Sequence, residues 1–439
     1  MQTIKKNLKK IIKVFITYTI ENDTRIYQLK HTPFKVERSL IKKAYQIYGN
    51  DPINAKKIVF DNYMGNGYGC NCKYVTEELI RRRTDLDLVW IVKNVNVHEE
   101  FPDKVRLVEY GSPEALAEYY TAAVWVCNYH LIKYWNKGLV KRAGQYYIQM
   151  WHGSFGIKKI EKNCDCLTSS QSWTYLAKKN SENTDFWISN SSFEDKVYRN
   201  AFWSVKNILK LGHPRNDIFF GNRQYSAYKK VREILSIDKE ENILLYVPTF
   251  REKFNFPEYK LDVARIKETL EKKTNEQWKI VVSLESRIFF CKIVVRLHPR
   301  MRDSLEKIYD NAENMIKNAD EYPDIQELLA ASQIVITDYS SCIFDFLLTG
   351  RPGFLFVPDL ESYDQERGFY YNLEETPFPI AHTNEELMDN IKNFDGEEYS
   401  RRVKNFLKGK GSVEDGNASV RVCDLIEHLL IEKEIENEY

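Results

Sequence analysis

The segment IVITDYSSCIFDF at residues 334–346 joins a short apolar run, a turn rich in hydroxyl groups and a second apolar run at helical spacing. The first run predicts a buried strand, and the second predicts a helix that opens directly after it. Such a helix start presents unpaired backbone N–H groups and the positive end of the helix dipole, which together favour an anion such as phosphate. A plain helix cap made by Asp338 or a serine explains the same pattern. Several other predicted strands are also followed by polar side chains, and this repetition favours an anion site over a plain helix cap.

Length and charge narrow the class of protein. The chain has 439 residues, more than one hydrophobic core usually supports, so two domains are expected. The 64 Lys and Arg residues nearly balance the 63 Asp and Glu residues, and the net charge of +1 argues against a general nucleic-acid-binding protein. With 43% hydrophobic residues, the composition is that of a globular protein.

The eight cysteines predict reduced thiols and no metal site. Cys70 and Cys72 form one C-x-C pair, and Cys164 and Cys166 form another, whereas structural zinc sites use C-x2-C spacing. Because no secretory signal precedes them, we expect a cytosolic protein, and we expect no cofactor. No apolar run reaches the ~18 to 20 residues that a membrane span needs.

Residues 1–20 combine five lysines with apolar residues that fall largely on one side of a helix. A basic amphipathic helix of this kind lies on an anionic membrane surface. A helix that packs on the protein core gives the same pattern, so both interpretations stay open. We expect residues 1–50 to form a helical N-terminal segment and the protein to be peripheral on the inner face of the cell membrane.

Short apolar runs alternate with helical patterns from residue 57 onward. Predicted strands cover residues 58–60, 86–92, 105–109, 122–127, 146–150, 186–189 and 207–211, with helices at 74–83, 113–120 and 193–201. This alternation predicts βαβ units and a parallel sheet that is covered on both faces. Ligands of such sheets bind beyond the carboxyl ends of the strands, so the residues after each strand are the candidates for a site.

A charged segment at residues 224–241 separates a second set of strands from the first. The second set covers residues 243–247, 292–297, the opening segment and 353–357, with a helix at 324–331 and a closing helix at 420–432. We therefore expect an α/β protein with two Rossmann-like parallel-sheet domains, at residues 51–223 and 224–439, that face a central cleft.

The residues that follow these strands share a chemistry. They are Arg or His side chains and hydroxyl groups: His152, Ser154, Arg215, Thr249, Arg251, Arg296, His298, Ser340 and Ser341. Arginine forks and N–H groups at a helix start are the directed donors that a pyrophosphate needs. The chain lacks a G-x-x-x-x-G-K-[ST] motif, so a P-loop nucleotidase is disfavoured.

Two of the eight histidines are candidates for catalysis. His152 could take the proton of an attacking hydroxyl at neutral pH. His298, two residues after Arg296, is better placed to donate to phosphate oxygens. A lone histidine more often makes one backbone hydrogen bond in a core or turn, but two of them among arginines at strand ends favour a functional role. His213, before Pro214, is predicted to support a turn.

An ordered set of motifs resembles the CDP-glycerol glycerophosphotransferase family of teichoic-acid and capsule synthesis. The motifs are QMWHGSFGIKK (149–159), LGHPRND (211–217), LYVPTFR (245–251), RLHPR (296–300), ITDYSSCIFDF (336–346) and DLESYDQERGFY (359–370). Each motif is weak alone, and their order over residues 57–371 makes the set specific.

The resemblance implies a GT-B fold, with the acceptor on the amino-terminal domain and the CDP-alcohol mainly on the carboxyl-terminal domain. It assigns the base to His152 and a second catalytic role to His298. The substrate-binding residues that it implies are Trp151, Gly153, Ser154, Phe155, Arg215, Thr249, Arg251, Arg296, Ser340, Ser341 and Asp345. Two motifs depart from the family's pattern: W-H-G-T-P is here Trp151 to Phe155 with a serine and without the proline, and G-Y-P-R has His213 in place of tyrosine.

The expected reaction is transfer of glycerol phosphate from CDP-glycerol to a hydroxyl of a cell-surface polymer or its lipid-linked precursor, with release of CMP. A ribitol-phosphate transferase and a GT-B sugar-nucleotide glycosyltransferase are the alternatives among enzymes. A nucleotide-binding or membrane-scaffold protein without activity is the alternative from another class. The density of basic and hydroxyl groups at the strand ends disfavours it.

Overall fold

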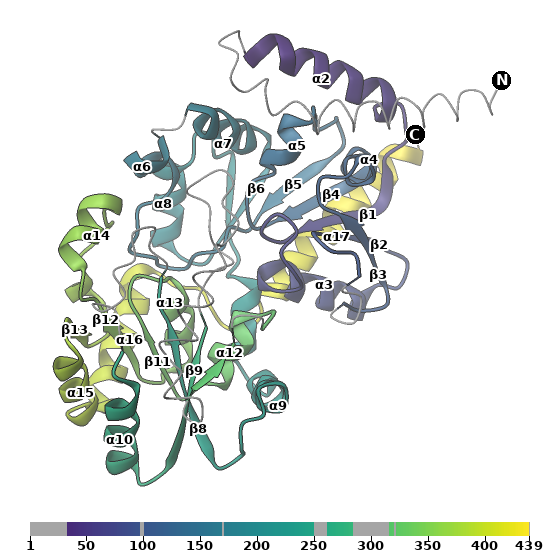
Figure 1. The fold of residues 1–439 in the computed structure, drawn as a ribbon. Helices are drawn as coiled ribbons and strands as arrows, with labels where there is room; N and C mark the ends of the chain where they lie inside the picture. The colour runs from purple at the N-terminus through teal and green to yellow at the C-terminus, as the bar shows by residue number, and fades with distance from the viewer. Residues whose placement is uncertain are drawn as a thin grey trace.

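The computed structural model of the chain describes residues 33–96, 101–168, 171–249, 261–283, 316–319 and 322–438 (Figure 1). Within these residues the chain forms two parallel sheets, one of seven strands and one of six. The two sheets belong to two α/β domains that face each other, which is the predicted GT-B architecture. The basic segment at residues 1–20 lies outside the described residues.

The first sheet has the strand order β3-β2-β1-β4-β5-β6-β7, and every pair in it is parallel. Its strands are β1 (Asn54–Asp61), β2 (Asp87–Val92), β3 (Val105–Glu109), β4 (Ala122–Cys127), β5 (Tyr146–Gln149), β6 (Phe186–Ser189) and β7 (Asn207–Lys210). All seven strands were predicted, because each is a short apolar run with polar residues at its ends. Their carboxyl ends meet at one edge, which faces the second domain (Figure 1).

Helices α2 (Pro33–Tyr48), α3 (Cys70–Arg82), α4 (Pro113–Thr121), α5 (Ile132–Asn136), α6 (Asp165–Thr168), α7 (Gln171–Asn183) and α8 (Ser192–Ala201) accompany this sheet. Helix α4 starts at the predicted residue, and α8 starts one residue before the predicted start at 193. Ser112 and Ser191 cap these two helices, since they accept hydrogen bonds from the backbone N–H groups of Ala115 and Glu194. Helix α3 starts at Cys70, four residues before the predicted start at residue 74.

The second sheet has the order β10-β9-β8-β11-β12-β13. Its strands are β8 (Glu241–Val247), β9 (Gln277–Val282), β10 (Ile316–Asn318), β11 (Ile334–Thr337), β12 (Gly353–Phe356) and β13 (Ile380–Ala381). The predictions of β8, β11 and β12 are confirmed, whereas β9, β10 and β13 were not predicted. The predicted strand at residues 292–297 lies outside the described residues. The helices are α9 (Arg223–Leu235), α10 (Val263–Thr274), α12 (Ile325–Ala331), α13 (Cys342–Phe346), α14 (Leu360–Arg367), α15 (Asn384–Lys392) and α16 (Gly396–Lys410).

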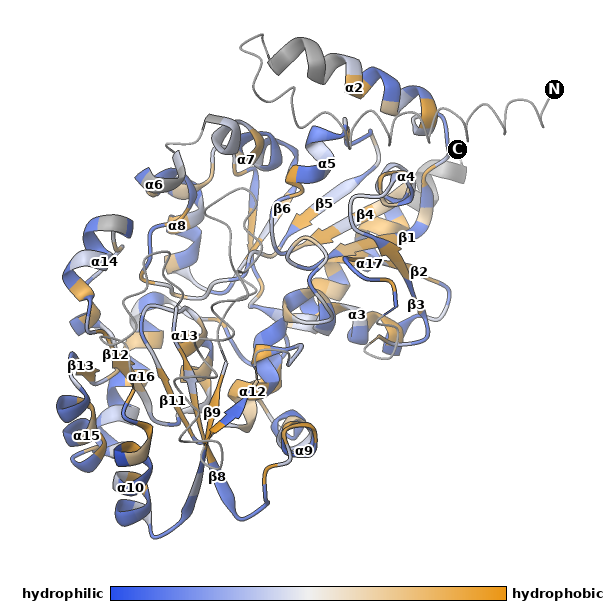
Figure 2. Cartoon of the chain, in the orientation of Figure 1, coloured by the Kyte–Doolittle hydropathy of each residue, from blue (hydrophilic) through white to orange (hydrophobic). Residues whose placement is uncertain are grey.

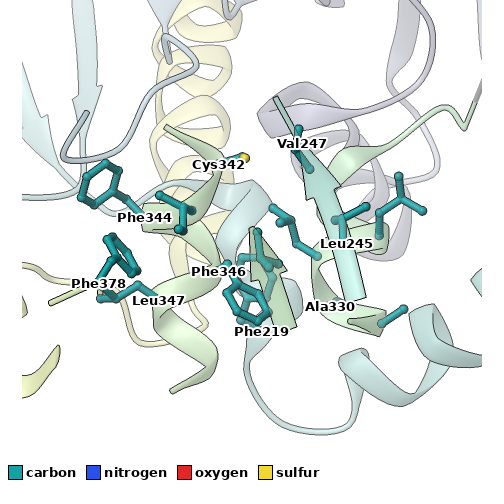
Figure 3. Packing of buried hydrophobic residues seen from close by; sticks show 14 of the residues in the cluster. Phe219, Leu245, Val247, Ala330, Cys342, Phe344, Phe346, Leu347 and Phe378 are labelled. Carbon is teal, nitrogen blue, oxygen red and sulfur yellow. The ribbon is translucent and has the colours of Figure 1, made fainter. Parts of the chain in front are cut away.

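The segment 334–346 lies at the centre of the second domain. Strand β11 is buried at every residue and pairs with β8 on one side and β12 on the other. Helix α13 follows it, and Phe344 and Phe346 point from that helix into the apolar cluster drawn in Figure 3. Burial of one phenylalanine side chain stabilises a fold by roughly 1.5–3 kcal/mol, so the two rings hold the turn between β11 and α13 against the sheet.

The last helix, α17 (Ala418–Glu438), returns to the first domain. Val422, Ile426 and Leu430 belong to the apolar cluster of the first sheet, and α17 lies beside α3 and β1 in Figure 1. The Asp217 carboxylate accepts hydrogen bonds from the backbone N–H groups at the start of α17, 2.9 Å from Ala418 N and 2.8 Å from Ser419 N. The closing helix was assigned to residues 224–439, but its apolar face packs on the other domain. The boundary near residue 223 stays a prediction.

Hydrophobic residues concentrate in the strands of both sheets, and hydrophilic residues cover outer helices such as α10 and α15 (Figure 2). Within the described part of the chain, no helix is both long enough and apolar enough to cross a membrane.

Candidate active site

The carboxyl ends of β5, β8 and β11 meet at a cavity between the two domains. It encloses about 170 Å³, and its lining includes Trp151, His152 and Gly153 after β5, Thr249 after β8, and Ser340 and Ser341 after β11. A smaller cavity of about 70 Å³ lies beside it, with Cys70, Arg215 and Asp345 in its lining. His152 and Ser341 line both cavities, so they lie where the two meet.

Backbone strain concentrates at these cavities. Eight non-glycine residues in the described chain have a positive φ: Tyr63, Met64, Cys70, Trp151, Phe155, Glu161, Ser236 and Asn275. The last two are helix C-caps, where a left-handed residue is common. The other six lie between β1 and the first residue of α3, and in the segment that follows β5. Strain of this kind persists where surrounding contacts enforce it, and it clusters at functional sites.

The loop after β5 is held by two buried amides. The Gln149 side chain accepts a hydrogen bond from Trp151 N at 2.9 Å. Asn71, at the start of α3, donates to the Trp151 carbonyl at 3.1 Å and accepts from Arg215 N at 3.1 Å. Asn71 is fully buried and therefore connects the His152 loop to the Arg215 turn. Asn71 was not predicted, because a single amide at a helix start carries no signal of such a role.

The hydrogen bond of His152 defines its tautomer. His152 Nδ1 lies 2.9 Å from the Asn128 carbonyl oxygen. A carbonyl can only accept, so Nδ1 carries the proton and Nε2 keeps a lone pair. Burial lowers the pKa of His152 to about 3, and the nearby Arg215 charge acts in the same direction. The ring is therefore neutral at physiological pH, with Nε2 able to accept a proton.

Arg215 and Asp345 form a buried ion pair across the domain interface. Arg215 Nε donates to Asp345 Oδ2 at 2.9 Å, and Nη2 donates to Oδ1 at 3.2 Å. Nη2 also donates to Ser154 Oγ at 2.9 Å, and Gln326 Nε2 donates to Asp345 Oδ2 at 2.8 Å. Burial raises the pKa of Asp345, but the Arg215 guanidinium outweighs it and holds this pKa below its usual value. Arg215 and Asp345, both predicted to bind substrate, thus bind each other in this structure.

The turn after β11 is organised by Asp338, which the sequence predicted as a cap or turn residue. Thr249 donates to the Asp338 carboxylate from its backbone N at 2.9 Å and from its hydroxyl at 2.5 Å. Ser341 lies against Gly156 of the loop after β5. The two residues are so close that a Cβ built on Gly156 would lie 3.4 Å from the Ser341 Cβ. Since α13 has five residues, the hydroxyl groups contribute more to this wall than a helix dipole does.

Two predicted site residues face the protein and not open space. Ser154 is buried, and its hydroxyl receives the Arg215 hydrogen bond. The Phe155 ring is buried in the apolar cluster of the second domain, 6.1 Å from the Phe406 ring, although Phe155 also contributes to the larger cavity. The remaining predicted residues Arg251, Arg296 and His298 lie outside the described residues.

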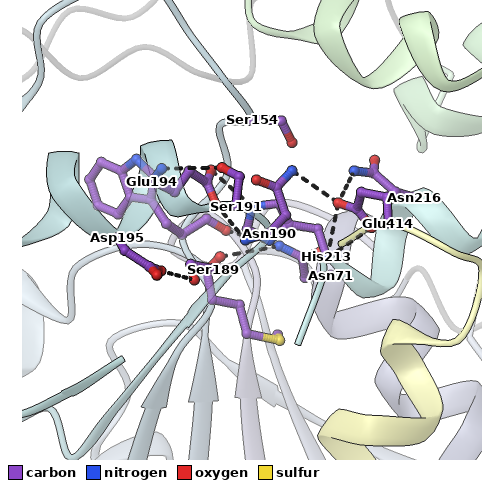
Figure 4. Close-up of polar contacts among 12 residues, drawn as sticks. Asn71, Ser154, Ser189, Asn190, Ser191, Glu194, Asp195, His213, Asn216 and Glu414 are labelled. Atoms are coloured by element: carbon purple, nitrogen blue, oxygen red, sulfur yellow. Dashed lines mark hydrogen bonds and ion pairs between the residues drawn. The ribbon is translucent and has the colours of Figure 1, made fainter. Parts of the chain in front are cut away.

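A polar network supports the turn that carries Arg215 (Figure 4). His213 Nε2 lies 2.9 Å from Glu194 Oε2, and His213 N donates to Glu414 Oε1 at 3.2 Å. Asn190 and Asn216 donate to the same Glu414 oxygen at 2.9 and 2.8 Å. Burial raises the pKa of Glu414 to about 7. His213 therefore supports the turn, as predicted. Nothing in the sequence indicated that Glu194 and Glu414 are its partners.

Comparisons with known proteins agree with this architecture. The family model described as CDP-Glycerol:Poly(glycerophosphate) glycerophosphotransferase matches residues 43–428. A teichoic acid poly(glycerol phosphate) polymerase of Staphylococcus epidermidis is 28% identical over 96% of this chain and 59% of its own length. A polymerase of the same name from Bacillus spizizenii is 28% identical over 88% of this chain and 97% of its own length. The chain thus spans about three fifths of one relative and nearly all of the other.

A solved structure has the same fold over nearly the whole chain. The wall teichoic acid polymerase TagF superposes with a TM-score of 0.76 at 25% identity, covering 97% of this chain and 98% of that chain. A variant of that polymerase has also been solved after a soak with CDPG.

Proposed function

The chain belongs to the CDP-glycerol:poly(glycerophosphate) glycerophosphotransferase family, and on that premise we propose that it transfers glycerol phosphate from CDP-glycerol to a hydroxyl of a cell-surface polymer or its lipid-linked precursor. CMP is the second product. The observation that carries the proposal is the geometry of His152. Its Nδ1 is committed to the Asn128 carbonyl, and its ring lines the cavity that the two domains share.

The transfer is a single displacement at phosphorus. The acceptor hydroxyl oxygen attacks the phosphorus that bears glycerol, and the bond from that phosphorus to the CMP oxygen breaks. The hydroxyl proton goes to His152 Nε2. Positioning of the two substrates and electrostatic stabilisation account for most of the catalysis of such transfers.

The second domain supplies the groups for the donor phosphates. Ser340 and Ser341 present hydroxyls at the larger cavity, and Arg367 lines the same wall. Thr249 also lines this cavity, but its hydroxyl proton is donated to Asp338. Arg251, Arg296 and His298 are the further donors that the family resemblance implies. A bound diphosphate would favour the protonated imidazole, so it would raise the pKa of His152 from its low value. His152 would then become a stronger base when the donor is in place.

A donor panel tests this function. Purified protein is incubated with a glycerol-phosphate-primed lipid acceptor and either CDP-glycerol, CDP-ribitol or a UDP-sugar. We expect CMP release with CDP-glycerol and an acceptor mass that grows by glycerol phosphate units. Growth by ribitol phosphate would assign the first alternative, and growth by a sugar would assign the second. Absence of nucleotide release from all three donors would refute a transferase.

We also propose that residues 1–20 bind an anionic membrane surface, which would place the protein at the inner face of the cell membrane. The support is their pattern of five lysines beside an apolar face. The full chain should sediment with vesicles that contain phosphatidylglycerol, and a variant without residues 1–20 should stay in the supernatant. Equal sedimentation of both would contradict this role.

A further inference from the structure

The larger cavity has two walls of different chemistry. The wall from the second domain carries hydroxyl groups and a cation, as described above. Besides Lys158, the wall from the first domain carries the rings of Tyr129, Trp151 and Tyr198 together with the carboxylates of Glu161 and Glu194. These five residues are at most 8% exposed, so the carboxylates lie in a setting where water screens their charge weakly.

The difference in charge between the two walls distinguishes phosphate groups from neutral hydroxyl groups. A phosphate is repelled by a weakly screened carboxylate, whereas a neutral hydroxyl donates a strong hydrogen bond to it. Aromatic faces pack well against the carbon skeleton of a polyol, as they do in most small-molecule sites. The first-domain wall therefore suits an uncharged, hydroxyl-bearing end of an acceptor, and the donor diphosphate is directed to the opposite wall.

The two carboxylates of the first-domain wall differ in the number of hydrogen bonds that they make to the protein. Glu194 Oε2 accepts from Asn190 N at 2.7 Å, and both carboxylate oxygens lie within 3.0 Å of His213 Nε2. Glu194 is thus part of the network that holds the Arg215 turn. Glu161 Oε2 lies 3.2 Å from His130 Nε2, but within the described part of the chain neither of these two buried atoms has a hydrogen-bond partner. Glu161 is the carboxylate whose role the fold alone does not explain.

The surroundings of Glu161 fix its position. Its backbone has a φ of 46°, which is a strained conformation for a residue with a Cβ. On one side the His130 ring packs against Trp151 with a centroid distance of 5.4 Å. On the other side the Tyr370 hydroxyl, from the second domain, accepts from Ile160 N at 3.2 Å. Contacts from both domains therefore hold Glu161 at the cavity.

We propose that Glu161 is a specificity-determining residue that accepts a hydrogen bond from the acceptor hydroxyl next to the one that attacks. The cavity then selects acceptors that end in two neighbouring hydroxyls. Lys158, on the same loop and in the same cavity, meets the phosphodiester that joins this diol to the rest of the acceptor. This inference rests on the proposed function, because it takes the acceptor to be a hydroxyl compound.

A matched pair of small ligands tests the selection by titration followed with saturation-transfer NMR. The methyl ester of glycerol phosphate ends in two neighbouring hydroxyls, and the methyl ester of hydroxypropyl phosphate lacks the middle one. We expect the wild-type protein to bind the diol about tenfold more tightly, which is the effect of one hydrogen bond to a charged group. Glu161→Gln should reduce this preference to about threefold or less.

The control is Glu182→Gln, on α7, whose side chain is 52% exposed and lies outside both cavities. It should keep the tenfold preference. In turnover, Glu161→Gln should raise the KM for a diol acceptor by about three- to tenfold and leave kcat and the KM for CDP-glycerol within about twofold. A merely structural role of Glu161 would change both KM values or the melting temperature.

Two results would overturn the inference: a wild-type protein that does not distinguish the two esters, or a folded Glu161→Gln variant that keeps the full preference. The binding titration needs no turnover. A protein that prefers the diol but releases no CMP from CDP-glycerol would refute the proposed transfer and leave the diol site intact.

Discussion

Removal of Asp345 tests whether the Arg215–Asp345 pair holds the two domains together. Arg215 makes three hydrogen bonds to Asp345 and Ser154, at 2.9, 3.2 and 2.9 Å. The two charged side chains are 1% and 4% exposed. Asp345→Ala leaves the guanidinium buried without its anion, and loss of one partner of a buried pair costs about 3–5 kcal/mol. We expect the free energy of unfolding to fall by this amount.

A double-mutant cycle separates the pair from its surroundings. Arg215→Met with Asp345→Leu replaces both charges by apolar groups, and such replacements of a buried pair are often neutral or stabilising. We therefore expect the double variant to be more stable than either single variant, which requires a coupling energy larger than about 3 kcal/mol. Urea unfolding followed by tryptophan fluorescence measures the four proteins of the cycle: the wild type, Arg215→Met, Asp345→Leu and the double variant.

The outcome that contradicts this reasoning is specific. If Asp345→Ala costs less than about 1 kcal/mol, Arg215 is not held by that carboxylate in solution. If the two single losses simply add in the double variant, the two side chains do not interact. Asp389→Asn is the control, because its ion pair with Lys392 is exposed and should change stability by no more than about 0.5 kcal/mol.

His152→Gln should lower kcat by about 10²- to 10⁴-fold while calorimetry finds CDP-glycerol affinity nearly unchanged; normal CMP release would remove His152 from the mechanism. Lys73→Met should lower the free energy of unfolding by about 3–5 kcal/mol, because Lys73 Nζ lies 2.8 Å from Asp324 and 2.6 Å from Glu327 in a buried interdomain cluster; an unchanged urea midpoint would contradict this. In the folded protein the pKa of Glu414 is raised to about 7, so the folded chain binds the proton of the Glu414 carboxyl more tightly than the unfolded chain does. Protonated Glu414 therefore stabilises the fold at low pH, and this stabilisation is lost as the pH rises toward 7. Urea unfolding between about pH 5 and 8 should show this loss in the wild type and a flatter profile in Glu414→Gln, and two parallel profiles would refute it.

The pattern of apolar and polar residues predicted most strands and helices correctly, but it did not predict which elements pack against each other. Strands such as β4 were predicted to the residue, because an apolar run between polar ends allows few other structures. Strands β10 and β13 were missed, since they have three and two residues and no periodicity can show in so few. Helix α17 was predicted to pack, but an apolar face does not tell which surface it covers.

The same limit applies to the site. His152 was predicted from its place after a strand, but its tautomer depends on the Asn128 carbonyl, which only the fold brings near. Arg215 and Asp345 were both predicted to bind substrate, but their ion pair was not predicted, because they lie 130 residues apart in the chain. Glu161 and His130 carried no signal, since a lone carboxylate and a lone histidine are common anywhere in a sequence.

The return of α17 to the first domain affects the order of events during synthesis of the chain. The first sheet is complete once β7 has left the ribosome, yet the face that Val422, Ile426 and Leu430 cover stays bare. The roughly 200 residues that follow need on the order of 10–40 s at typical elongation rates. During that time the nascent first domain exposes apolar surface of the kind that chaperones bind. A ribosome that stalls before residue 418 would therefore release an aggregation-prone fragment and not a folded half.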